Sequence, residues 1–258
     1  MKEREQEFIH KEPKSFVSSG DMGDVIYHLL FIKVLGGNKY HIDPNGGGYL
    51  RDGYIQNGDG NPPKFNLSKA LFLLPLLKEQ TYIDDVDLYS GPPKEAWRSY
   101  DVHVGEFHKD DLGLQNLTFF HAKKYDLPLQ LLNEPWLTVK NSIKIDDKRD
   151  TIISRSLRYR GNDNYYFFNR ERLNQKGIFV GLQDEYSDFV RRYNCPDIPL
   201  AKTDTALDLA EVINGHHNFI GNGSLATSIA LGLGLNVEYE FCPHACHYMF
   251  NRNNIKVF

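Results

Sequence analysis

One local pattern restricts the fold of this chain more than any other feature: an apolar β-like run, a turn of small residues, and an apolar helical stretch. Residues 15–19 form the first run, the segment from Gly20 to Asp24 forms the turn, and residues 25–35 form the helical stretch. Strands that alternate with helices form parallel sheets, because each crossover helix returns the chain to the edge where it started. The sequence therefore predicts the α/β class, with parallel sheets covered by helices on both faces.

The pattern occurs in two series. The first continues with strands expected at 39–42, 86–89 and 102–104, with a helix at 69–79 that Ser68 caps, and with segments 129–132 and 136–139 at its end. The second consists of strands expected at 151–154, 177–181 and 218–221 and helices expected at 185–193, 205–213 and 224–233. Two such series predict two doubly wound, Rossmann-like domains facing a cleft, where ligands usually bind.

The charged run 144–150 separates the two series and is the expected linker. The sequence thus divides into a loose N-terminal arm (1–14), an N-terminal domain (15–145), a C-terminal domain (148–240) and a tail (241–258). We expect the tail to pack back on the first domain.

Composition excludes several classes of protein. Of 258 residues, 41% are hydrophobic and 25% charged, which is typical of a folded soluble protein and not of a disordered one. A net charge of −4 argues against a protein that coats nucleic acid by bulk charge. The longest apolar stretch, 70–77, is short of the roughly 20 residues of a membrane helix, and the charged N-terminus is no signal peptide. Three cysteines favour a reducing compartment, so we expect a cytoplasmic protein.

The first candidate site is the turn that contains Gly20, Asp21, Gly23 and Asp24. Glycines after a strand let the backbone approach a ligand, and the following helix N-terminus stabilises negative charge. The alternative is that Asp24 only caps the helix. The turn lacks the third glycine of the dinucleotide-binding fingerprint, which argues against that cofactor.

The second candidate is a basic segment directly after the strand expected at 151–154, with Arg155, Arg158 and Arg160. Guanidinium groups bind phosphate oxygens in pairs, so three of them at the carboxyl end of a parallel strand predict a diphosphate site. The alternative is a solvated loop whose arginines pair with surface acids.

The third candidate is the turn of Asn222, Gly223 and Ser224, which leads from a strand into a helix. Small residues at this point let a phosphate or a sugar approach the free N–H groups of the helix. The alternative is tight packing between strand and helix, which glycine also permits.

Two further segments have weaker patterns. Residues 43–64 form a long loop rich in glycine, in which Tyr49, Arg51 and Tyr54 are candidate acceptor contacts of a lid; a plain surface insertion fits the composition equally well. Near the C-terminus, four potential zinc ligands lie within six residues: Cys242, His244, Cys246 and His247. Structural zinc sites normally divide their ligands into two separated pairs, so we expect no metal here.

Together, the three turns resemble those of the heptosyltransferases and their relatives, which transfer heptose from ADP-heptose to lipopolysaccharide and have the glycosyltransferase B fold. The run Met22-Gly23-Asp24-Val25 matches the N-terminal signature of that family, and residues 219–232 resemble its donor-site turn and helix. Segments 181–186 and 134–137 look like parts of uncharacterised relatives, and the resemblance covers most of residues 15–240.

The resemblance implies an inverting transfer of a sugar from a nucleotide-diphosphate donor to a hydroxyl acceptor, such as a glycan, without a metal or other cofactor. It makes Asp24 the base that deprotonates the acceptor, places the acceptor on the N-terminal domain, and makes the basic residues after the first C-terminal strand the partners of the leaving diphosphate. Two departures weigh against heptose as the donor sugar: the family's Asp-Ser-Gly-Pro turn is Gly221-Asn222-Gly223-Ser224 here, and arginines replace its lysine-tryptophan element.

Three alternatives stay open on the sequence. The same fold carries glycosyltransferases of modified DNA bases and sugar-nucleotide epimerases, and a DNA-binding enzyme would show a basic rim and salt-sensitive binding. The third alternative is a catalytically silent module that binds a nucleotide or a glycan, favoured by the missing carboxylate of the donor-site turn.

Overall fold

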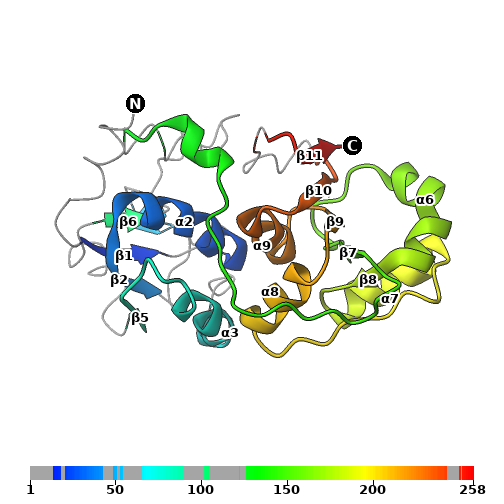
Figure 1. Cartoon of the computed structure of the whole chain (residues 1–258), viewed down its shortest axis with the longest axis horizontal. Coiled ribbons are helices and arrows are strands. Elements are labelled where there is room, and N and C mark those ends of the chain that lie inside the picture. The colour runs from blue at the N-terminus through cyan, green and yellow to red at the C-terminus, as the bar shows by residue number, and fades with distance from the viewer. Residues whose placement is uncertain are drawn as a thin grey trace. The chain divides into compact units, whose positions relative to one another are not determined.

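The computed structural model describes residues 14–18, 21–42, 49–50, 53–54, 66–89, 102–104, 122, 126–242, 250 and 252–258, and the statements below refer to these residues. The chain divides into two compact units, Met1–Thr138 and Val139–Phe258, and each contains its own parallel sheet (Figure 1). The α/β class and the parallel sheets are thus confirmed. Within the described part, no helix is long and apolar enough to cross a membrane.

The first unit contains a four-stranded parallel sheet, a short hairpin and two long helices. Its elements are β1 (Lys14–Ser18), α2 (Met22–Leu35), β2 (Gly37–Ile42), β3 (Tyr49–Leu50), β4 (Gly53–Tyr54), α3 (Leu67–Lys78), β5 (Asp85–Leu88), β6 (Val102–Val104) and the 3-10 helix η2 (Leu129–Asn133). The sheet has the order β5-β2-β1-β6, and Phe16 pairs with Tyr40 on one side and Val102 on the other. The next strands, β2 and β5, thus lie on one side of β1, and the later strand β6 lies on its other side, as in a mononucleotide-binding half.

Helix α2 is buried on nearly all sides, from Val25 to Ile32 and again at Leu35. A helix that is apolar all round is stable only inside a protein, so α2 forms the centre of the first unit's core. It ends at Gly36, whose φ of 74° is a left-handed conformation that glycine adopts without strain.

The end of the first unit is fixed to this core by side-chain hydrogen bonds. The indole Nε1 of the buried Trp136 donates to the carbonyl of Ile26 in α2, over 2.9 Å. The amide of Gln80 donates to the carbonyl of Thr138 and accepts from its N–H, both over 3.0 Å. These bonds satisfy buried polar groups and hold residues 136–138 on the first unit.

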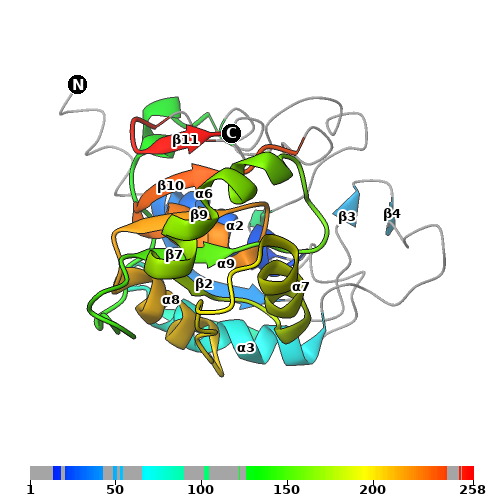
Figure 2. The same ribbon diagram turned by 90° about the vertical axis from the view of Figure 1, so that its right-hand side faces the viewer.

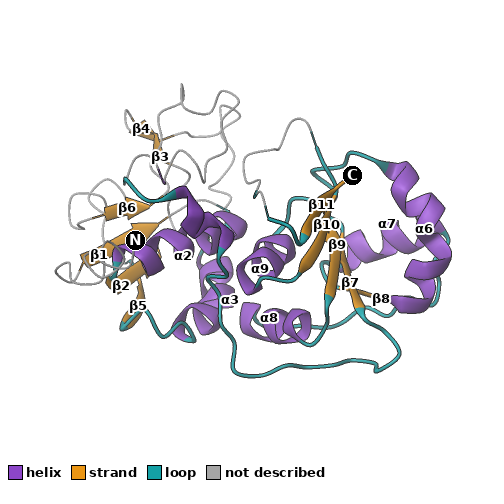
Figure 3. Ribbon diagram, turned by 45° about the horizontal axis from the view of Figure 1, so that its top comes forward, coloured by secondary structure: helices purple, strands orange, loops and turns teal. Residues whose placement is uncertain are grey.

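The second unit contains a five-stranded parallel sheet between two layers of helices. Its elements are β7 (Thr151–Ser154), α6 (Asp163–Lys176), β8 (Gly177–Phe179), α7 (Gln183–Tyr193), α8 (Ala206–Asn214), β9 (Asn218–Gly221), α9 (Leu225–Leu233), β10 (Asn236–Tyr239) and β11 (Ile255–Val257). The sheet has the order β11-β10-β9-β7-β8, and α6 and α7 cover the face nearer the viewer in Figure 2. Figure 3 shows α8 and α9 on the opposite face, so this unit is doubly wound.

The structure corrects several expectations for single elements. Asn66, not Ser68, caps α3, because its side-chain oxygen accepts from the N–H of Lys69 over 3.0 Å. The tail does not form a separate segment: Ile255–Val257 pairs with β10 as the outermost strand of the second sheet. Helix α6 and strand β10 were not predicted.

The expected linker begins earlier than its charge pattern indicates. Ile143 donates its N–H to the carbonyl of Glu211 over 2.9 Å, and Asn141 donates to the Glu211 carboxylate over 2.7 Å. A Cβ on Gly215 would lie 2.2 Å from the carbonyl oxygen of Ile143, so glycine is required for this approach. Residues 141–143 therefore belong to the second unit and lie against the end of α8.

His216 follows α8 and is 3% exposed, with Nδ1 2.8 Å from the carbonyl of Val212. Within the described residues its Nε2 has no hydrogen-bond partner, so a proton there would be buried without an acceptor. Burial lowers the pKa of His216 from 6.5, and Lys144 and His217 also lower it, whereas Val212 and Asp150 act in the opposite direction.

We expect the stability of the protein to fall as the pH drops below 6.5, because the unfolded chain then binds a proton that the buried His216 resists. Above this pH the imidazole is neutral in both states and the contribution is fully present. His216→Asn keeps an N–H for Val212 but does not titrate, so its unfolding midpoint should fall less steeply than that of the wild type between about pH 8 and about pH 5.5. Thermal unfolding at several pH values measures this difference. Parallel pH curves for the two proteins would contradict it.

Candidate functional site

The candidate site lies where the strand order of the second sheet reverses. From β7 the chain reaches β8 on one side, and later β9 on the other, so the loops after β7 and β9 leave adjacent strands in different directions. Ligands of open parallel sheets bind at such a point, beyond the carboxyl ends of the strands. The loop from Arg155 to Asn162 and the turn from Asn222 to Ser224 both begin there.

Ser224 starts helix α9 as its N-cap. Its Oγ accepts from the N–H of Thr227 over 3.2 Å and lies 3.5 Å from the Oγ of Ser154 at the end of β7. The first N–H groups of an α-helix have no partner within the helix and carry partial positive charge. The turn therefore directs the start of α9 to the same edge of the sheet as the loop after β7.

Asn222 is completely buried and joins the two loops. Its Oδ1 accepts from the N–H of Ser156 over 2.8 Å, and its Nδ2 donates to the carbonyls of Ser156 and Tyr159, both over 2.9 Å. The Asn222 amide thus makes these hydrogen bonds to groups of the protein itself. The prediction that Asn222 contacts a donor is wrong for its side chain, which holds the loop.

Gly223 and Tyr159 are in close contact at this junction. A Cβ on Gly223 would lie 3.0 Å from Cδ2 of the Tyr159 ring, which is tighter than ordinary packing. The guanidinium carbon of Arg158 lies 4.9 Å from the centre of the same ring, within the range of a cation–π interaction. Arg158 is exposed, so the structure presents its charge at the carboxyl edge of the sheet.

Arg155 has a different role from the predicted one. It is 1% exposed and donates to Glu240 over 2.8 Å from Nε and 2.6 Å from Nη2, to Asp163 over 2.7 Å, and to the hydroxyl of Tyr193. Burial alone would lower the pKa of Arg155, but the hydrogen bonds and charge of Glu240 raise it above its usual value. A guanidinium committed in this way cannot bind a phosphate, so Arg155 is structural.

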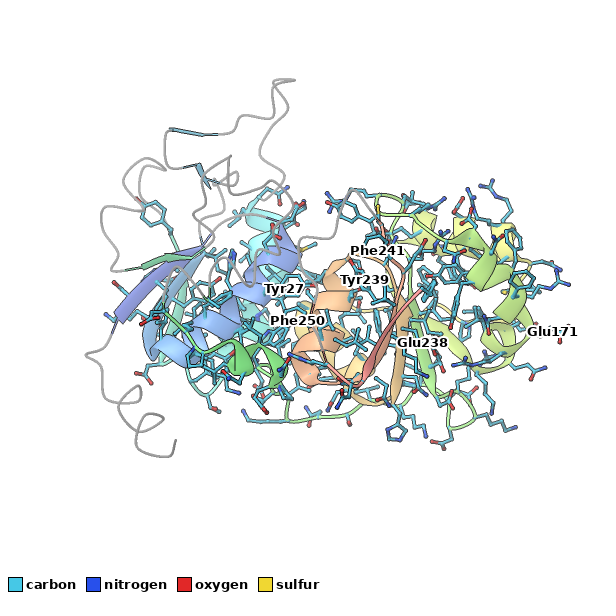
Figure 4. All side chains as sticks on the ribbon, turned by 90° about the horizontal axis from the view of Figure 1, so that it is seen from above. Tyr27, Glu171, Glu238, Tyr239, Phe241 and Phe250 are labelled. Atoms are coloured by element: carbon cyan, nitrogen blue, oxygen red, sulfur yellow. The ribbon has the colours of Figure 1, made fainter. Side chains whose placement is uncertain are left out.

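Glu240 is the central residue of the second unit that the sequence did not reveal. It is 0% exposed and accepts from Arg155, from the hydroxyl of Tyr166 over 3.0 Å, and from the N–H of Gly161 over 2.6 Å. It directly follows β10, and Figure 4 shows the neighbouring Glu238 on that strand. The sequence pattern offered one indication, a pair of glutamates in an otherwise apolar run, but did not show which arginine lies beside it.

Arg160 is also paired. Its Nη2 lies 2.5 Å from Oδ2 of Asp188 on α7, and Arg191 and Arg192 approach the same carboxylate at 3.3 and 3.6 Å. The pKa of Asp188 is lowered: burial raises it, but the hydrogen bond and charge of Arg160 outweigh this effect. The alternative of arginines paired with acids therefore holds for Arg160, while the contact of Arg158 with a phosphate stays a prediction.

Glu185 is a second acid near this edge to which the sequence assigned no role. Its Oε2 accepts from the N–H of Leu182 over 3.0 Å at the start of α7. Burial raises the pKa of Glu185, whereas hydrogen bonds from the backbones of Leu182 and Leu157 and the charge of Arg158 lower it. The carboxylate thus contacts the loop that carries Arg158.

In the first unit, Asp24 caps helix α2, as the alternative reading of its turn predicted. Its Oδ2 accepts from the N–H of Asp21 over 2.9 Å, while the Oδ1 of Asp21 lies 3.9 Å from the ammonium of Lys69 on α3. Gly23 lies in the first turn of α2. This cap is a hydrogen bond to one oxygen of the Asp24 carboxylate. The role of Asp24 as a base stays a prediction.

Other predicted residues lie outside the description. Tyr49 and Tyr54 pair through their backbones in the hairpin β3-β4, whose side chains are not described. Gly20, Arg51, His244, Cys246, His247 and most of the loop 43–64 are outside the described residues. Cys242 is buried with a free thiol, and among the described residues no group of three or more histidine, cysteine, aspartate or glutamate side chains is arranged to hold a metal.

Two parallel sheets with these strand orders, and a strand–turn–helix junction at the reversal point of the second, define an α/β chain with a Rossmann-like sheet in each unit. The chain is similar over 93% of its length to 85% of glycosyl transferase family 9 from Veillonella parvula DSM 2008, with a TM-score of 0.54 and 13% identity. Over 95% of its length it is similar to 90% of E. coli ADP-heptose LPS heptosyltransferase II, with a TM-score of 0.53 and 11% identity.

No family model matches the sequence, and no curated protein matches it. At 11–13% identity, the likeness to the two solved structures shows the fold. The resemblance to heptosyltransferase-like glycosyltransferases is confirmed at that level.

We expect Glu240→Gln to lower the free energy of unfolding by roughly 3 kcal/mol, because it leaves the buried guanidinium of Arg155 with the partly exposed Asp163 as its remaining counter-charge. Urea denaturation followed by circular dichroism measures the change. Glu171→Gln is the matched control, since this side chain points outward from α6 (Figure 4) and should change stability by less than about 0.5 kcal/mol. If the two substitutions lowered the free energy of unfolding equally, the buried pair of Arg155 and Glu240 would contribute no more to stability than an exposed glutamate does.

Proposed function

We propose that this protein is a glycosyltransferase that moves a sugar from a nucleotide-diphosphate donor to a hydroxyl acceptor. The observation that carries the proposal is the juxtaposition, at the reversal point of the second sheet, of the N-terminus of α9 and the loop with the exposed Arg158. The fold shared with two glycosyltransferases supports it.

The donor's diphosphate fits this edge by its charge. Ser224 begins α9 with its side chain turned to the N–H of Thr227, and the N-terminus of a helix attracts anions through its N–H groups and its dipole. Arg158 adds a guanidinium, which binds two phosphate oxygens at once. Ser224, the N-cap residue at this junction, is partly exposed, so the start of α9 is not fully covered by the protein.

The reaction requires a base and a stabilised leaving group. The acceptor oxygen forms a bond to the anomeric carbon, the bond from that carbon to the diphosphate oxygen breaks, and the nucleoside diphosphate leaves with the electron pair. A single displacement of this kind inverts the anomeric centre. Arg158 and the start of α9 stabilise the charge on the leaving group, and Asp24, in the first turn of helix α2, takes the acceptor's proton.

Arg158→Gln should weaken the binding of nucleoside diphosphates by about tenfold or more, since a charge-assisted contact to phosphate contributes roughly 1.5–3 kcal/mol. Titration calorimetry with ADP, GDP and UDP measures this change and shows which base is preferred. Arg170→Gln removes another exposed arginine, one on α6, and should leave the dissociation constant within about twofold. If both variants bind as the wild type does, the loop after β7 does not hold the diphosphate.

Asp24→Asn should lower kcat by about 100-fold or more, because an amide cannot accept the acceptor's proton. The dissociation constant of the nucleoside diphosphate should stay within about twofold, since the phosphates are bound by the second unit. Asp84→Asn, an exposed aspartate of the same unit, is the control. The assay is release of nucleoside diphosphate from the sugar donors of the preferred base, with candidate glycan acceptors. Turnover at the wild-type rate in Asp24→Asn would remove this residue from the base role.

A further inference from the structure

The loop that carries Arg158 is held at both ends by buried side chains from distant parts of the chain. At its start, the amide of Asn222 bonds both the N–H and the carbonyl of Ser156. At its end, the carboxylate of Glu240 accepts from the N–H of Gly161 over 2.6 Å. A loop fixed in this way has one conformation before a ligand arrives, so binding does not have to order it.

The contacts of Asn222 specify an amide at this position. Two carbonyl oxygens, those of Ser156 and Tyr159, face its Nδ2, and one N–H faces its Oδ1. The residue is 0% exposed, so water cannot replace these partners. A carboxylate of the same length would place a negative oxygen against two carbonyl oxygens and would repel both.

The same residue joins the loop to the start of α9. The hydroxyl of Thr227 donates to the carbonyl of Asn222, and the hydroxyl of Ser156 donates to the carbonyl of Gly223 over 3.2 Å. The bond from Asn222 to the carbonyl of Tyr159 places the Tyr159 ring against Gly223, and the ring in turn lies beneath Arg158. The Asn222 amide is therefore the link that bonds the loop with Arg158 at both Ser156 and Tyr159.

We propose that Asn222 is a positioning residue that sets Arg158 and the N-terminus of α9 at the separation that a donor diphosphate requires. The inference rests on the proposed function and deepens it: this side chain acts on the donor through the loop and does not touch it. Its removal must therefore weaken donor binding, while the chemical step, which depends on the first unit's base, continues at nearly the same rate once donor is bound.

Asn222→Asp tests the proposal with the smallest possible change. We expect the dissociation constant for the preferred nucleoside diphosphate and the KM for its sugar donor to rise about 10- to 100-fold, with kcat within about threefold of the wild type. Donor binding should recover as the pH is lowered, because a protonated carboxyl group again donates a hydrogen bond to one of the two carbonyls. A purely structural role would lower the unfolding midpoint without this division between KM and kcat and without recovery at low pH.

Asn214→Asp is the matched control. The Nδ2 of Asn214 also donates to two oxygens, the carbonyl of Asn141 and the hydroxyl of Ser142, both over 3.2 Å, but at the end of α8 and away from the loop. It should leave KM and its pH dependence unchanged. If Asn222→Asp does not fold, Gly223→Ala replaces it: the added methyl group pushes the Tyr159 ring aside without altering the buried amide, and the same rise in KM is expected.

The outcomes separate this inference from the function on which it rests. If the wild type binds ADP, GDP or UDP and transfers sugar, but Asn222→Asp or, where that variant does not fold, Gly223→Ala has wild-type KM values, the positioning role is wrong and the proposed function stands. A fall in kcat at unchanged KM would also overturn it. If the wild type binds no nucleoside diphosphate, both the function and the inference fall.

Discussion

The second unit depends on a buried ion pair between Arg155 and Glu240. Removing two charges from water carries a large penalty, and the structure offsets it by surrounding the pair with hydrogen bonds and aromatic faces. Arg155 lies 4.7 Å from the centre of the Tyr166 ring, and the Tyr166 hydroxyl donates to Glu240. Asp163 adds a second carboxylate, so the positive charge of the buried guanidinium faces two negatively charged groups. The pair thereby joins the ends of β7 and β10 to the start of α6.

This constraint determines which arginine of the basic segment is exposed at the carboxyl edge of the sheet. Arg155 lies inside the unit, Arg160 pairs with Asp188 on α7, and Arg158 between them stays exposed over Tyr159. The buried pair fixes the loop from one end and Asn222 fixes it from the other. Two buried networks thus determine how the loop holds Arg158.

The two units are connected by a short segment whose ends are both anchored. Residues 136–138 are bonded to α2 and to Gln80 of the first unit, and residues 141–143 are bonded to the end of α8 in the second. The chain passes from one anchored part to the other through residues 139–140. In the proposed function, Asp24 belongs to the first unit and Arg158 to the second. Residues 139–140 are the stretch of chain that connects these two units.

The sequence alone determined the α/β class, the positions of most strands and the turns that follow them. Strands β7 and β9 are short apolar runs buried on both faces, and the turn of small residues after β9 marks the chain's exit at the edge of the sheet. Helix α6 was missed because of its fourteen residues only Tyr166 and Leu173 are buried, while Phe168 is 87% exposed, so its sequence has no helical period of burial. The tertiary structure alone decided what each site residue does. Arg155 is structural because Glu240, 85 residues further along the chain, lies beside it, and Asn222 holds the loop because that loop, 66 residues earlier, reaches it. Local patterns specify where a chain turns, but a hydrogen bond between distant segments exists only once the sheet has brought them together.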